Sequence, residues 1–70
     1  MRKFKEINGK RFATIEENVS IGKHIAYRVT EYDTSSGKTE LFFCQCVFER
    51  ELLTPFVEHY TREGWKEEAE

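Results

Sequence analysis

Residues 39–48 are the most apolar stretch of the chain, and apolar side chains would lie on both faces of a strand formed by them. A strand that is buried on one face alternates between apolar and polar residues, whereas a strand buried on both faces does not. We therefore expect this segment to be a central strand of a sheet. Its apolar positions are Leu41, Phe42, Phe43, Cys44, Cys46, Val47 and Phe48.

The chain is too short for a second core. It has 70 residues, of which 39% are hydrophobic and 34% are charged, which is typical of one small domain. No apolar run approaches the roughly 20 residues that span a membrane, and the charged beginning does not resemble a signal peptide. We expect a cytoplasmic protein without membrane attachment, and the small size suggests a bacterial or phage accessory protein.

The dipeptide Asn8-Gly9 predicts a hairpin, because it favours the type I′ turn of two-residue hairpin loops. Alternating segments flank it on both sides. With Ile7 opposite Lys10, the rest of the register follows. One face of the hairpin then holds Phe4, Ala13 and Ile15, and the other holds Lys3, Lys5, Ile7, Lys10, Phe12 and Thr14.

Residues 16–22 lose the alternation and read as a loop, and residues 23–32 resume a pattern typical of a strand. A turn at residues 33–37 joins this strand to residues 39–48. A four-residue loop gathers one wholly apolar face, and we favour it; a three-residue loop would place Ile25, Tyr27 and Val29 with Phe43, Gln45 and Val47 instead. The favoured register leaves a mixed face of His24, Ala26, Arg28, Thr30, Tyr32, Leu41, Phe43, Gln45 and Val47.

The last third of the chain is predicted to be an amphipathic helix with an apolar stripe at the helical period. Either Thr54 caps a helix that has Pro55 in its first turn, or a turn of helix begins near Glu51. Gly64 suits the position after the helix end, and Trp65 would pack back on the last turn. The stripe is Leu52, Leu53, Phe56, Val57 and Tyr60.

These elements predict an α+β fold with a four-stranded antiparallel sheet, made of two hairpins, and one C-terminal amphipathic helix packed on one face. Residues 1–65 form the single domain. Residues 66–70 are expected to be a frayed acidic end.

The charge and the cysteine content bear on which partners and which metal or redox sites the sequence predicts. The formal net charge is −2, with a basic beginning and an acidic end, so bulk charge does not predict a nucleic-acid partner. Cys44 and Cys46 lie two residues apart and would share a strand face. We interpret them as buried free thiols; a metal site with His24 and His59, or a redox role, is the alternative. We expect no metal and no cofactor.

No motif for catalysis stands out, so we expect a protein that is not an enzyme. Ten aromatic residues accompany eleven Ile, Leu and Val, and one short helix covers only one sheet face. The mixed face then predicts an interface, either with a second copy in a homodimer or with a host or regulatory protein. The expected partner-binding residues are Phe12, Arg28, Tyr32, Leu41, Phe43 and Val47.

Single-stranded nucleic acid is the alternative partner for the same face. Basic side chains interleaved with aromatic rings are typical of proteins that bind single strands without sequence preference. The residues for this function are Lys3, Lys5, Lys10, Phe12, Arg28, Tyr32 and Phe43.

Overall fold

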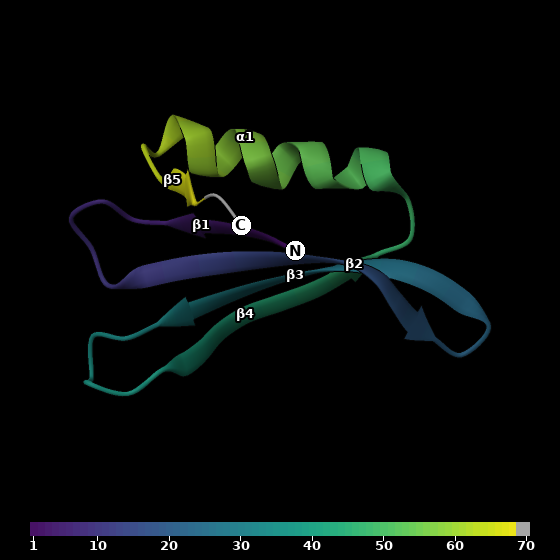
Figure 1. Cartoon of the computed structure of the whole chain (residues 1–70), viewed down its shortest axis with the longest axis horizontal. Coiled ribbons are helices and arrows are strands. Elements are labelled where there is room, and N and C mark those ends of the chain that lie inside the picture. The colour runs from purple at the N-terminus through teal and green to yellow at the C-terminus, as the bar shows by residue number, and fades with distance from the viewer. Residues whose placement is uncertain (69–70) are drawn as a thin grey trace.

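The computed structural model describes residues 1–68 and confirms an α+β fold with an antiparallel sheet and one short helix. Within that range the sheet has five strands, not the four expected, in the order β4-β3-β2-β1-β5. The helix lies across one face of the sheet (Figure 1). The strands are β1 (Arg2–Lys5), β2 (Arg11–Ile21), β3 (His24–Asp33), β4 (Glu40–Val47) and β5 (Lys66–Glu68), and a 3-10 turn, η1 (Arg50–Leu53), precedes α1 (Thr54–Arg62).

The register of the first hairpin is as predicted. Phe4 lies opposite Ala13, and Lys5 lies opposite Phe12. The turn itself is not of type I′, which requires positive φ at both central residues, because neither Asn8 nor Gly9 has a positive φ. Register was therefore predicted correctly from the alternation of the two segments.

The loop expected at residues 16–22 is wrong, because β2 continues to Ile21 and pairs with β3 along its length. The alternation is lost there because the strand is irregular: the register shifts between Glu16 and Val19, and Asn18 has a φ of 59°. The long β2 and β3 therefore occupy the middle of the sheet. In residues 1–68 no other strand pairs with the outer side of β4, so the expected central strand is an edge strand.

The favoured register of the second hairpin is also wrong. Tyr27 lies opposite Val47, and Val29 lies opposite Gln45. The register then shifts by one residue between Glu31 and Tyr32, so β4 carries an extra residue, Phe42, at a bulge. Residues 43–47 therefore lie on the faces that the three-residue loop predicts, but Leu41 lies on the opposite face from that prediction because of the bulge, and the connection between β3 and β4 is longer.

The end of α1 is built as the sequence predicts. Gly64 has a φ of 81°, its N–H donates to the Thr61 carbonyl at 3.1 Å, and the Trp65 N–H donates to the Tyr60 carbonyl at 2.9 Å. These two bonds define a Schellman motif. At the helix start, η1 runs directly into α1, which agrees with a helical turn beginning near Glu51 rather than with Thr54 as the cap.

The Schellman motif turns the chain back toward the sheet, where residues 66–68 pair with β1. We expected these residues to fray; instead they form β5, and the side chains of Arg2 and Glu67 meet with an N–O distance of 2.7 Å. Residues 69–70, also part of the expected frayed end, lie outside the described residues.

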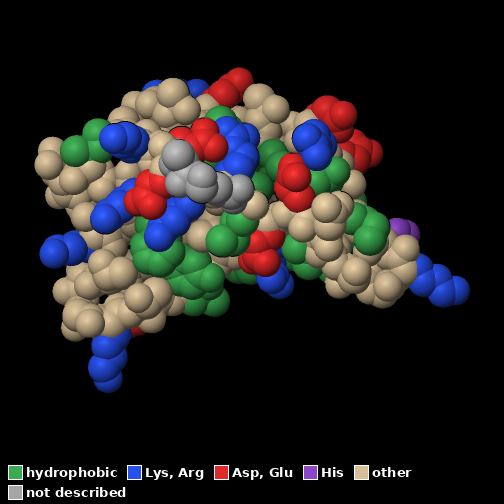
Figure 2. All heavy atoms as spheres, viewed as in Figure 1, with side chains coloured by type: hydrophobic (Ala, Val, Ile, Leu, Met, Phe, Trp, Pro, Cys, Tyr) green, Lys and Arg blue, Asp and Glu red, His purple; other side chains and the backbone are tan. Residues whose placement is uncertain are grey.

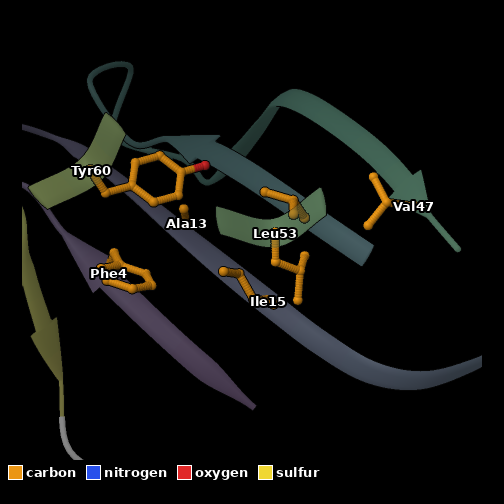
Figure 3. Packing of buried hydrophobic residues seen from close by; sticks show 7 residues of the cluster. Phe4, Ala13, Ile15, Val47, Leu53 and Tyr60 are labelled. Carbon is orange, nitrogen blue, oxygen red and sulfur yellow. The ribbon is translucent and has the colours of Figure 1, made fainter. Parts of the chain in front are cut away.

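The core lies between the helix and one sheet face, as Figure 3 shows. Tyr60 is fully buried, its ring stacks on Trp65 with centroids 4.7 Å apart, and its ring also contacts Phe4 at 5.3 Å. Its hydroxyl donates to Glu31 Oε2 at 2.8 Å. The buried cluster consists of Phe4, Ala13, Ile15, Val29, Val47, Leu53 and Tyr60.

Candidate interaction surface

The sheet face turned away from α1 is the candidate surface, and we call it the open face. Successive residues of a strand point to opposite faces, so the neighbours of the core residues in β1–β4 point to this side. Residues paired across strands share a face, which places Leu41 beside Tyr32. The open face includes Lys3, Lys5, Phe12, Thr14, Glu16, Arg28, Thr30, Tyr32, Leu41, Cys44 and Cys46.

One pair of stacked aromatic rings lies on the open face. The rings of Phe12 and Tyr32 stack with centroids 4.9 Å apart, and the Lys3 ammonium lies 4.7 Å from the Phe12 centroid. Next to Tyr32, on the neighbouring strand β4, lies Leu41, which is 66% exposed. Figure 2 shows a green hydrophobic area over the left-hand ends of β2 and β3, with several blue side chains along its upper edge. Apolar surface and positive charge therefore adjoin at this end of the sheet.

The middle of the open face is polar. Arg28 donates two hydrogen bonds to Glu16, at 3.1 and 3.0 Å, and these raise the pKa of Arg28 above its usual value. Arg28 also lies opposite Cys46, and Thr30 lies opposite Cys44. This part of the face is hydrogen-bonded within the chain and carries little net charge.

The two cysteines are free thiols, but they are not buried as we expected. Cys44 is exposed, and Cys46 is half-buried. The reason is their position, because β4 is an edge strand and the helix covers only its other face.

The structure brings together four of the six residues expected to bind a partner: Phe12, Arg28, Tyr32 and Leu41 are on the open face. Phe43 and Val47 lie on the other face. Val47 is 6% exposed within the core, and Phe43 packs against that core, with its ring 6.1 Å from Phe56. The bulge causes this division, because it reverses which residues of β4 share a face.

The residues expected to bind nucleic acid divide in a similar way, with Phe43 in the core region and Arg28 held by Glu16. The three lysines lie together. They line a hollow of about 210 Å³ near the first hairpin turn, together with Arg11, Phe12, Gly9 and Thr34. Arg11 is paired with Asp33, whose pKa is lowered mainly by two hydrogen bonds from Ser35 and also by Arg11. The lysines are Lys3, Lys5 and Lys10.

Sequence reasoning missed the free edge of β4. The edge is eight residues long and carries Leu41 and Phe42, which are 66% and 53% exposed. The length of the chain between Lys10 and Asp33 was the available signal. This region is long enough for two strands that pair with each other, and it then leaves no segment there to cover β4.

No protein-family model, curated protein or solved structure matches the chain. Among residues 1–68, no helix is both long enough and apolar enough to cross a bilayer.

Proposed function

We propose that this chain is a small, non-enzymatic interaction protein that pairs with a second copy of itself, edge to edge, through β4 (Glu40–Val47). The free edge of β4 is the observation that carries the proposal. The open face next to it, with Tyr32 and Leu41, extends the contact beyond the backbone.

An unpaired edge strand offers a row of backbone N–H and C=O groups to any other strand. Natural proteins usually protect such edges with lysine, proline, β-bulges or very short strands. The bulge at Phe42 interrupts the start of β4, and residues 43–47 pair regularly with β3. β4 has neither lysine nor proline, and its one charged residue, Glu40, is at its start. The strand is thus suited to binding another strand by backbone hydrogen bonds.

A second copy suits this edge because like charges placed directly opposite one another destabilise a strand pair. Residues 41–47 carry no charged side chain, so two copies of β4 can lie antiparallel without repulsion. Symmetric pairing of the same surface on both subunits is also the commonest way in which soluble proteins associate. A homodimer needs no other partner to satisfy the edge.

Analytical ultracentrifugation of Gln45→Lys tests the proposal. Gln45 is exposed and is the middle residue of the regular stretch 43–47. A lysine there keeps the fold and, where two copies of this stretch pair antiparallel about its centre, brings two ammonium groups together across the dimer axis. We expect a wild-type dimer over roughly 1–100 μM and a monomeric variant. Ser20→Lys adds the same charge at an exposed position of β2. It is the control and is expected to remain dimeric.

Two results would contradict the proposal. A strictly monomeric wild-type protein at about 100 μM would exclude self-association and favour a host or regulatory protein as the partner. A dimer that persists in Gln45→Lys would place the interface elsewhere.

Binding of single-stranded nucleic acid is the second candidate, and the lysine-lined hollow beside Phe12 favours it. The ring geometry opposes it. Phe12 already has Tyr32 and the Lys3 ammonium against it, which leaves little ring surface for a base to stack on. We expect a fluorescent oligothymidine to show no change in anisotropy at low salt, whereas tight binding that weakens with salt would favour this candidate.

A further inference from the structure

Cys44 and Cys46 form a pair of accessible thiols on one face of an edge strand. They lie on the open face, opposite Thr30 and Arg28 respectively. Cysteine is among the most frequently buried residue types, and a packing role in the core does not explain an exposed thiol. Cys44 is exposed and Cys46 is half-buried, so chemistry explains this pair better than packing does.

The spacing of the pair suits a bridging atom better than a direct bond. Two residues of strand separate the Cα atoms by about 6.6 Å. That distance is at the upper limit for a disulfide, which usually joins Cα atoms about 4.4–6.8 Å apart. An ion bound between the two sulfurs joins them by two metal–sulfur bonds in place of one S–S bond. The bridge is then longer, so the two Cα atoms need not approach each other.

The surroundings favour a complex with one negative charge. Arg28 lies directly opposite Cys46 on the open face, and Glu16 holds its guanidinium in place by two hydrogen bonds. The Thr30 hydroxyl oxygen is 3.8 Å from the Cys44 sulfur, which gives that sulfur a polar neighbour. A bis-thiolate complex of a monovalent ion would therefore lie beside the guanidinium of the Arg28–Glu16 pair.

We infer that Cys44 and Cys46 together bind one soft monovalent cation, of which Cu(I) is the biological example. Thiolates select soft metals such as Cu(I). A structural zinc site takes four ligands, and this pair supplies two. Binding is an exchange without oxidation: two thiols and one monovalent ion give one S–metal–S complex of charge −1 and two released protons.

The test is an anaerobic titration of the reduced protein with Cu(I) in competition with bicinchoninate, whose coloured Cu(I) complex reports the copper that the protein has not bound. We expect one ion per chain, with two protons released per ion bound. Cys44→Ser and Cys46→Ser should each weaken binding by more than the roughly 10- to 100-fold that loss of an outer-shell partner costs. Arg28→Gln should weaken binding within that 10- to 100-fold range.

A matched control keeps two thiols but separates them. The double variant Cys46→Ser with Gln45→Cys has adjacent cysteines that point to opposite faces of β4. We expect it to bind as weakly as the single serine variants. Binding equal to that of the wild type would overturn the inference, because any two neighbouring thiols would then suffice.

Two further results would also overturn the site within one chain. One ion per two chains, with dimerisation that requires the ion, would mean that the metal bridges subunits. Failure of the reduced protein to take Cu(I) from bicinchoninate would mean that the pair binds no ion. The inference is independent of the proposed self-association, because Gln45→Lys leaves both thiols in place and should bind Cu(I) as the wild type does.

Discussion

Replacing Tyr60 by phenylalanine removes one oxygen atom from the core and leaves the ring packing in place. Tyr60 is 0% exposed, and its hydroxyl donates to the Glu31 carboxylate at 2.8 Å. Burial and this hydrogen bond raise the pKa of Tyr60 well above its usual value, so the hydroxyl stays a donor. Tyr60→Phe leaves the half-buried Glu31 carboxylate without that donor.

The expected cost can be estimated from the charge on the acceptor. A hydrogen bond to a charged group contributes about 1.5–3 kcal/mol to stability. A chain of 70 residues has a free energy of unfolding of roughly 3.5–10 kcal/mol, at about 0.05–0.15 kcal/mol per residue. Tyr60→Phe should therefore remove a large fraction of the stability, and lower the melting temperature by roughly 4–8 °C for each kcal/mol lost.

Urea unfolding followed by tryptophan fluorescence measures this loss. Trp65 is the only tryptophan in the sequence, and its ring stacks on Tyr60, so the signal reports on this part of the core. Glu31→Ala should cost less in the Tyr60→Phe background than in the wild type, because the shared bond is already absent. A loss below about 0.5 kcal/mol, or additive effects of the two changes, would refute the reasoning.

The same hydrogen bond predicts a difference at alkaline pH. The pKa of Tyr60 is raised in the folded chain, so its contribution to stability is complete below the unfolded value of 10.0 and is lost as pH rises above it. Wild type should therefore lose about 1.4 kcal/mol more per pH unit above pH 10 than Tyr60→Phe does. Equal slopes for the two proteins would show that the hydroxyl ionises freely.

Three further predictions concern the edge strand β4, the C-terminal strand β5 and the turn at Gly64 that precedes β5. Phe43→Glu should cost more than about 2 kcal/mol in urea unfolding because it places a charge against the core, whereas Leu41→Glu should stay within about 0.5 kcal/mol; equal costs would contradict the observed register. Arg2 lowers the pKa of Glu67, so this exposed pair stabilises the fold by at most about 1 kcal/mol above pH 4.5, and this stability is lost as pH falls through the lowered value. Arg2→Gln should therefore reduce the dependence of the free energy of unfolding on pH in the acid range. Gly64→Ala should cost roughly 1–2 kcal/mol because φ is 81°, and a neutral result would mean that the turn can rearrange.

The parts of the fold that could be predicted depend on interactions between residues close in sequence. The first hairpin has a short connection and clear alternation on both sides, so its register follows from the sequence. The helix end needs only a glycine, and an aromatic residue after it, which Gly64 and Trp65 supply.

The remaining parts of the fold depend on contacts between residues that are far apart in the sequence. The bulge at Phe42 shifts β4 by one residue, and one residue is enough to move Phe43 and Val47 from the predicted surface into the core. Residues 66–68 are all charged and have no pattern of their own; they form a strand because the turn at Gly64 brings them alongside β1. The candidate surface was thus predicted in its β2 and β3 residues and only partly in β4.

The short charged strand β5 limits what the protein can assemble into. It covers the outer side of β1 with three residues, all of them of charged types, so a further strand adding there would have to displace or face these charges. Growth of a sheet into a fibril needs two adhesive sides on every subunit. If two copies pair through β4 as we propose, the dimer presents only the short, charged edges of its two β5 strands, which do not favour the addition of a further strand.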